Sequence, residues 1–368
     1  NGVHHVGPVL RLVARLQPRS YADLHREVLK PLYRLYMTCS AALKARILEA
    51  LTALLRNWAE IDWESHLAAT RLDPALDPTV DDDSANVEST ASLTSGAKPQ
   101  AHRFTPIPGG VDYYKVIFEF VTYVDQIILA GLVDEEDHEL IQVQAGAFFR
   151  TAADLHTTHL LPFVVPPSPG IVYRLLLSPT LLGQEVLCGI LVRMRASFTA
   201  LRSHVANKME LSRGAIDLPT ESGLEKMALF NSYVWDVCNT LWLDKPLPKP
   251  PGERRKGETT SVLFELADET GLTEAMRKLP PHQVAGAFNL VQSLPFHGIA
   301  ARFARERGVA IDTLLGSAAL KSDFLDYLQD EVGCVGVVDF LCSFISSLVK
   351  RRQEQTPESP SAQATDSA

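Results

Sequence analysis

Hydrophobic residues recur every three or four positions along most of this chain, which is the pattern of amphipathic helices. The clearest case follows Ser40, a residue type that favours a helix N-cap, and continues to Trp58. Its apolar positions are Leu43, Ile47, Leu51, Leu54, Leu55 and Trp58. Residues 24–36 repeat the spacing, and Pro31 is expected to kink the helix there or to start a new turn. We therefore expect residues 20–58 to form a helix pair.

The same periodicity, interrupted by breaks, predicts the helices that follow. Two are expected between residues 111 and 159, the second starting at the acidic turn Asp134–Asp137. A long helix is expected from Glu221 to Leu243, and a last one from Ser322 to Leu348, which Gly333 and Gly336 can bend. Shorter helices are expected near residues 170–178, 181–196, 198–208, 260–267, 273–279, 282–294, 299–308 and 310–320.

The predicted fold class is all-α, because no segment shows the alternation between turns that is typical of β-hairpins. Successive helix pairs of about 40–50 residues have the length of HEAT repeats, so we expect a HEAT-like helical repeat solenoid with a disordered insertion and tail. The expected parts are helical pairs at 1–71, a disordered acidic and Ser/Thr-rich linker at 72–110, a helical repeat block at 111–245, a Pro-rich basic linker at 246–258, a C-terminal helical block at 259–350 and a disordered tail at 351–368.

Composition agrees with a folded chain. Hydrophobic residues make up 46% of it, enough for a core, and the net charge of −9 argues against a protein that coats nucleic acid along its whole surface. The five cysteines are scattered and odd in number, which indicates free thiols in a reducing compartment. The most apolar stretch, 171–192, is interrupted by charges and a proline, so no membrane span is expected. The chain starts at Asn1 without a signal-peptide pattern, and we expect it to be a piece of a longer protein.

Candidate chemistry is sparse. Phosphate-binding loops, dinucleotide fingerprints, zinc-protease helices and nucleophile elbows are absent from the sequence, so we predict no enzyme, no catalytic residues and no cofactor. His156 and His159 are three residues apart, but two imidazoles fall short of a metal site, and no metal is predicted. Cys334 and Cys342 are expected on a similar face of one helix, where core packing is the better interpretation.

Two basic clusters are candidates for contact with the DNA backbone. Arg254, Arg255 and Lys256 lie in the predicted linker, and Arg302, Arg305 and Arg307 crowd one short helical segment. The alternative is that each cluster lies on a solvent-exposed face where nearby acidic side chains balance its charge. Because no aromatic residues alternate with these charges, any contact would be to the backbone and independent of base sequence.

Four stretches together resemble the centromere protein I family of the inner kinetochore, and their order and spacing match across nearly the whole chain. Residues 72–110 and 250–320 match poorly. The stretches are LHREVLKPLYRLYMT with ILEALTALLRNW (24–38 and 47–58), PPSPGIVYRLLLSPTLLGQEVLCGILVRMR (166–195), FNSYVWDVCNTLWLDKPL (230–247) and DFLDYLQDEVGCVGVVDFLCSFISSL (323–348).

The resemblance implies a HEAT-like solenoid without catalytic residues, located in the nucleus at the centromere and kinetochore. It implies binding to centromere proteins H and K, and in many lineages M, in an assembly that ties centromeric nucleosomes to the outer kinetochore. We therefore expect a structural subunit with neither a small-molecule substrate nor a membrane partner, or alternatively a helical module that binds DNA backbone. Trp242, Arg193 and Arg195 are the candidate partner contacts, with core packing as the alternative for Trp242.

Overall fold

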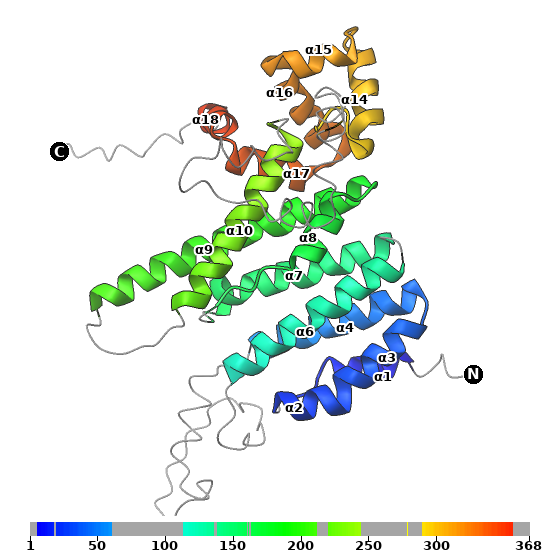
Figure 1. Cartoon of the computed structure of the whole chain (residues 1–368), viewed down its shortest axis with the longest axis vertical. Coiled ribbons are helices and arrows are strands. Elements are labelled where there is room, and N and C mark those ends of the chain that lie inside the picture. Colours follow the sequence, from blue (N-terminus) through cyan, green and yellow to red (C-terminus); the bar gives the residue numbers. More distant parts are fainter. Residues whose placement is uncertain are drawn as a thin grey trace, which may run out of the picture.

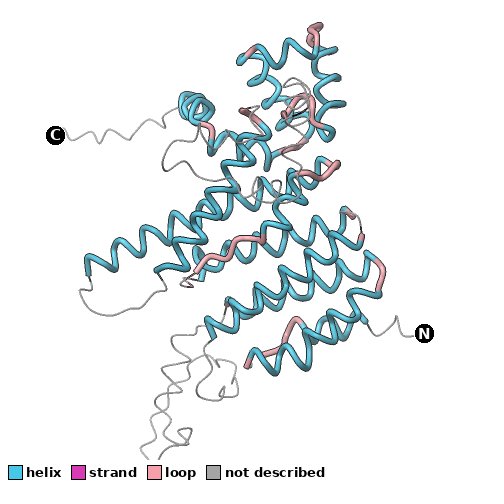
Figure 2. Tube along the Cα trace, viewed as in Figure 1, coloured by secondary structure: helices cyan, strands magenta, loops and turns pink. Residues whose placement is uncertain are grey.

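The structure is a computed structural model that describes residues 6–17, 20–60, 113–135, 138–159, 161, 163–211, 220–243, 278 and 289–355. Within these ranges the ordered elements are all helices and no strand is present, so the all-α prediction is confirmed (Figure 2). The predicted linkers at 72–110 and 246–258 and the helix predicted at 260–267 lie outside the described residues, as does the helix predicted at 273–279 apart from Lys278. The helix predicted at 282–294 is wrong in its described part, because residues 289–293 form turns and bends and a helix begins only at Leu294. The C-terminal helical block extends to Gln355, past the boundary predicted at residue 350.

The helices form one continuous array (Figure 1). In chain order they are α1 (Val6–Val13), α2 (Tyr21–Leu24), the π-helical turn η2 (His25–Leu29), α3 (Lys30–Thr38), α4 (Ala41–Ala59), α6 (Tyr113–Asp134), α7 (Glu139–His159), α8 (Pro169–Leu176), α9 (Leu181–Leu211), α10 (Thr220–Leu241), α14 (Leu294–Glu306), α15 (Ile311–Gly316), α16 (Ala318–Tyr327), the π-helical turn η5 (Leu328–Val332), α17 (Val335–Phe344) and α18 (Ser346–Gln355).

Most of these helices stack in two rows. In one row α4, α7, α9 and α17 each pack against the next, and in the other α3 packs on α6 and α6 on α8. Helix α10 follows α8, since Tyr173 donates to the Asp236 carboxylate at 2.6 Å and Tyr233 donates to the Pro167 carbonyl at 3.0 Å. Helices within a row run parallel: along α7 and α9, Gly146 lies beside Val186 and Asp154 beside Arg193.

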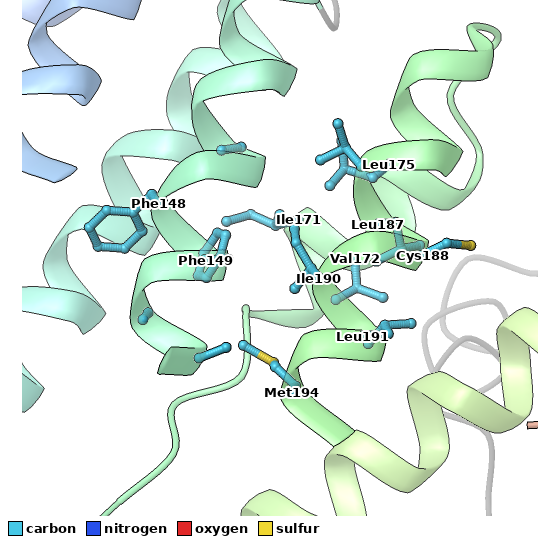
Figure 3. Close-up of a cluster of buried hydrophobic side chains, with 14 of the residues drawn as sticks. Phe148, Phe149, Ile171, Val172, Leu175, Leu187, Cys188, Ile190, Leu191 and Met194 are labelled. Atoms are coloured by element: carbon cyan, nitrogen blue, oxygen red, sulfur yellow. The ribbon is translucent and has the colours of Figure 1, made fainter. Parts of the chain in front are cut away.

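The core lies between the two rows. Figure 3 shows its middle part, where Phe149 of α7, Ile171 of α8 and Met194 of α9 meet, each fully buried. Burial of one such side chain contributes about 1.5–3 kcal/mol. Stacking these apolar stripes is therefore what holds successive helices together.

The acidic turn after α6 has a different role from the predicted helix start. Asp134 ends α6, and α7 begins only at Glu139. The ammonium of Lys44, whose side chain is 1% exposed, reaches this turn from α4 and bonds the carboxylates of Asp134 and Glu135. Burial opposes the charge of Lys44, but the two carboxylates outweigh that cost and raise its pKa. The turn is thus an ion-paired contact between α4 and the α6–α7 hairpin.

Further predicted helix boundaries were wrong. The break predicted near residue 197 is absent: α9 continues unbroken from Leu181 to Leu211, and the buried hydroxyl of Ser197 donates to the carbonyl of Ala153 at 2.6 Å. The helix predicted over 310–320 is two helices separated at Ser317, which caps α16. The helix predicted from Ser322 to Leu348 is divided into α16, η5, α17 and α18; Gly333, in the left-handed region at φ 78°, ends η5, and the extended Ile345 separates α17 from α18.

Two smaller expectations had different outcomes. Cys334 precedes the first residue of α17, so it does not share a helix with Cys342 as predicted. Pro31 lies in the first turn of α3 directly after the π-helical turn η2, which agrees with the predicted new turn.

Helix α6 is long and apolar enough to cross a membrane by length and composition alone. Just over half of its apolar window, 56%, is buried within the protein. It packs against α3, α4, α7 and α8, and this packing accounts for its apolar composition.

Candidate interaction surfaces

Arg193, a predicted partner contact, forms an ion pair between α9 and α7, which are neighbours in one row. Its guanidinium on α9 makes two bonds to the carboxylate of Asp154 on α7, at 2.6 and 3.1 Å. Hydrogen bonding to Asp154 raises the pKa of Arg193. The Arg193 side chain is still 58% exposed, so the pair contributes about 0–1 kcal/mol.

Arg195, the second predicted contact, is engaged at the C-terminal end of α17. Its guanidinium donates to the Ser343 carbonyl at 2.6 Å and lies 5.0 Å from the centre of the Phe344 ring. A cation at the C-terminus of a helix is favourable because the unpaired carbonyls carry partial negative charge. In this structure Arg195 therefore joins α9 to α17.

Glu185 makes the matching contact at the N-terminal end of α17. Its carboxylate accepts hydrogen bonds from the backbone N–H groups of Gly336 at 2.5 Å and Val337 at 3.0 Å. A side chain at Gly336 would meet the Glu185 carbonyl oxygen at 2.6 Å, so only glycine allows this approach. Sequence reasoning treated Glu185 only as an interruption of an apolar stretch, because its partner lies some 150 residues away.

Trp242, the third predicted contact, is partly buried. The Lys321 ammonium lies 5.6 Å from the centre of its ring, and the side chain lines a shallow pocket between α10 and α16. Trp235, which lies on nearly the same face of α10, is 47% exposed. Seven residues make almost two full helical turns, so the sequence pattern predicts the same burial for both tryptophans. The structure distinguishes them because residues of α16 and residues 289–291 line a pocket with Trp242, which directly follows α10, and Trp235 is not part of that pocket.

The arginine cluster on α14 is exposed, and two of its three members have partners. Arg302 donates to the carboxylate of Glu306 at 2.9 Å, and this hydrogen bond raises the pKa of Arg302. The guanidinium of Arg307 lies 5.3 Å from the centre of the Phe303 ring. Arg305 is exposed. The other predicted cluster, Arg254, Arg255 and Lys256, lies outside the described residues. DNA-backbone contact by either cluster stays a prediction.

His156, Cys238 and Cys334 are buried. The Nδ1 atom of His156 lies 2.6 Å from the Leu161 carbonyl oxygen in a buried position that ties the end of α7 to the following segment. The side chain of His159 lies outside the described atoms. Burial raises the pKa of the Cys238 and Cys334 thiols to about 12, so both stay protonated at neutral pH. Among the described residues, no three His, Cys, Asp or Glu side chains lie close enough together to hold a metal ion.

Comparison with known proteins confirms the predicted resemblance to the centromere protein I family. The resemblance is distant. The chain is 24% identical to Centromere protein I of Mus musculus over 352 residues, which is 94% of this chain and 40% of the mouse protein. It is 22% identical to Centromere protein I of Gallus gallus over 308 residues, or 79% of this chain and 36% of the chicken protein. The chain thus spans about two fifths of the length of these relatives. No family model matches it.

Proposed function

We propose that this chain is a non-enzymatic structural subunit of the inner kinetochore that scaffolds partner proteins at centromeric chromatin. The observation that carries the proposal is the similarity to Centromere protein I, which extends over 94% of the chain in the mouse comparison. A match of this extent includes nearly all the helices of the chain, as expected if the chain shares its architecture with Centromere protein I. We therefore place the protein in the nucleus, at the centromere and kinetochore, during chromosome segregation.

The stacked helices support a HEAT-like solenoid as the architecture of this scaffold. Parallel helices within each row, with the two rows running in opposite directions, are the arrangement expected when helical hairpins repeat along an axis. Such arrays present long surfaces to partner helices. The proposed partners are centromere proteins H and K, and M where it is present.

Direct contact with centromeric DNA is a second, more limited proposal. The exposed guanidinium of Arg305 favours it, whereas the pairing of Arg302 with Glu306 favours a solvated face. With a net charge of −9, any such contact is local and supplements protein partners.

Localisation in the cell tests the proposed function. When the protein is tagged with a fluorophore at its own locus, the signal is expected to form foci that coincide with the centromeric histone throughout the cell cycle. In the Trp58→Ala variant, which removes a buried core side chain, the foci are expected to weaken in proportion to the loss of folded protein. A well-expressed, folded protein that stays diffuse or gathers elsewhere would contradict the proposal.

A further inference from the structure

Four large apolar side chains lie exposed at one edge of the helical array, where the hairpins turn. Val133 is 54% exposed, Leu140 44%, Val143 41% and Leu177 49%. We call these four residues the apolar edge. They occupy the end of α6, the start of α7 and the end of α8, so they come from consecutive hairpins.

Hydrogen bonds bring these turns together. The Gln142 side chain donates to the hydroxyl of Ser178 at 3.2 Å and accepts from the hydroxyl of Thr180 at 3.2 Å. Leu140 and Val143 lie two residues before and one residue after the buried Gln142 on α7, and Leu177 directly precedes Ser178. The turns follow one another along the right side of the array in Figure 2. The hydrogen bonds therefore hold the start of α7 and the α8–α9 turn, which carry three of these four residues, next to each other.

The charge beside this surface is negative. The turn between α6 and α7 carries the carboxylates of Asp134 and Glu135, and α7 begins with the exposed Glu139. The one ammonium bonded to this turn among the described residues is that of Lys44, which is buried beneath it. Among the described residues, the three carboxylates of Asp134, Glu135 and Glu139 outnumber the one ammonium of Lys44, so the charge that meets an incoming partner here is negative.

We propose that the apolar edge is the docking surface for a basic amphipathic helix of a partner protein. Neighbouring packed helices are about 8–10 Å apart, and residues i and i+7 of a helix are about 10.5 Å apart on one face. A partner helix with apolar residues at i, i+3 or i+4, and i+7 can thus contact α7 and the α8–α9 turn together, while its lysines or arginines face the carboxylates. This inference rests on the proposed scaffold function and specifies one class of partner for it.

A designed peptide pair tests the proposal with the full chain. The first peptide is a fluorescein-labelled helix of about 18 residues with leucines at three- and four-residue spacing and lysines elsewhere, and its twin carries glutamates in place of the lysines. Fluorescence anisotropy measures the binding of each. The variant Leu140→Ser/Val143→Ser/Leu177→Ser removes three of the four side chains of the apolar edge. The control, Val9→Ser/Leu12→Ser, removes two apolar residues of α1 that are 52% and 68% exposed.

The wild-type chain and the α1 control are expected to bind the lysine peptide equally, and the triple variant at least about tenfold more weakly. Glu139→Gln should weaken binding about twofold, and the glutamate peptide should bind at least about tenfold more weakly than the lysine peptide. All variants should keep the wild-type melting temperature, because the replaced side chains are exposed.

Three results would overturn the proposal. One is no binding of the lysine peptide by the wild-type chain, and another is equal binding by the triple variant. The third is self-association of the wild-type chain that the triple variant abolishes, which would make the apolar edge a contact between two copies. Because the assay contains no kinetochore protein besides this chain, its failure leaves the localisation result unaffected, and the two proposals can fail separately.

Discussion

Replacing Trp58 by alanine is expected to lower the free energy of unfolding by about 3–5 kcal/mol. The indole is 1% exposed, and its ring centre lies 5.2 Å from that of Phe120 on α6. Its Nε1–H donates to the Leu16 carbonyl at 2.7 Å, which ties the segment after α1 to α4. One substitution therefore leaves a large cavity between α4 and α6 and an unpaired carbonyl at the end of α1.

Chemical denaturation followed by circular dichroism measures this effect, and Trp235→Ala is the matched control. Trp235 is 47% exposed, so its replacement should change the free energy of unfolding by less than about 1 kcal/mol. Trp58→Phe should fall between the two, because it keeps an aromatic ring but lacks the donor. Equal effects at the two tryptophans would mean that the burial assigned to Trp58 is wrong.

Replacing Gly131 by alanine is expected to destabilise the protein by about 1–3 kcal/mol or more. A methyl group at this position of α6 would lie 1.8 Å from the Oη atom and 2.8 Å from the Cζ atom of Tyr36. Tyr36 on α3 is fully buried, so its ring has no space to retreat. The substitution should therefore push α3 away from α6.

Tyr36→Phe supplies the internal test of this contact. The Tyr36 hydroxyl is buried and has no hydrogen-bond partner among the described residues, so its removal alone should be neutral or stabilising. In Gly131→Ala/Tyr36→Phe the closest clash disappears, and the two changes should couple by about 0.5–3 kcal/mol. Gly189→Ala in α9 is the control, since nothing lies within 4 Å of its added methyl group and it should stabilise the helix. Additive effects of the two changes would contradict the contact.

Local periodicity predicted the long helices well, because each of their turns places apolar residues on the buried face. The helix expected at 40–58 is α4 at Ala41–Ala59, and the one expected at 221–243 is α10 at Thr220–Leu241. Prediction failed where a contact with another helix decides the outcome. Ser197 was predicted as a break, but it lies within α9 and its hydroxyl bonds the α7 carbonyl of Ala153, a contact that no local pattern contains.

The candidate contacts show the same limit more strongly. A sequence indicates that Arg195 is a charge on a helix, but its bond to Ser343 depends on how α17 stacks on α9. The four residues of the apolar edge look like any other apolar positions in the chain. They are exposed because they lie at the hairpin turns, where no neighbouring helix of the described structure covers them.

The measurement that tests the scaffold function most directly is light scattering of the purified chain mixed with centromere proteins H and K of the same species. At micromolar concentration, a single particle is expected whose mass equals the sum of the three chains, and it should persist during size-exclusion chromatography. The Trp58→Ala variant, destabilised by about 3–5 kcal/mol, should form less of it. A folded chain that elutes alone beside an intact H–K pair would contradict the proposed function.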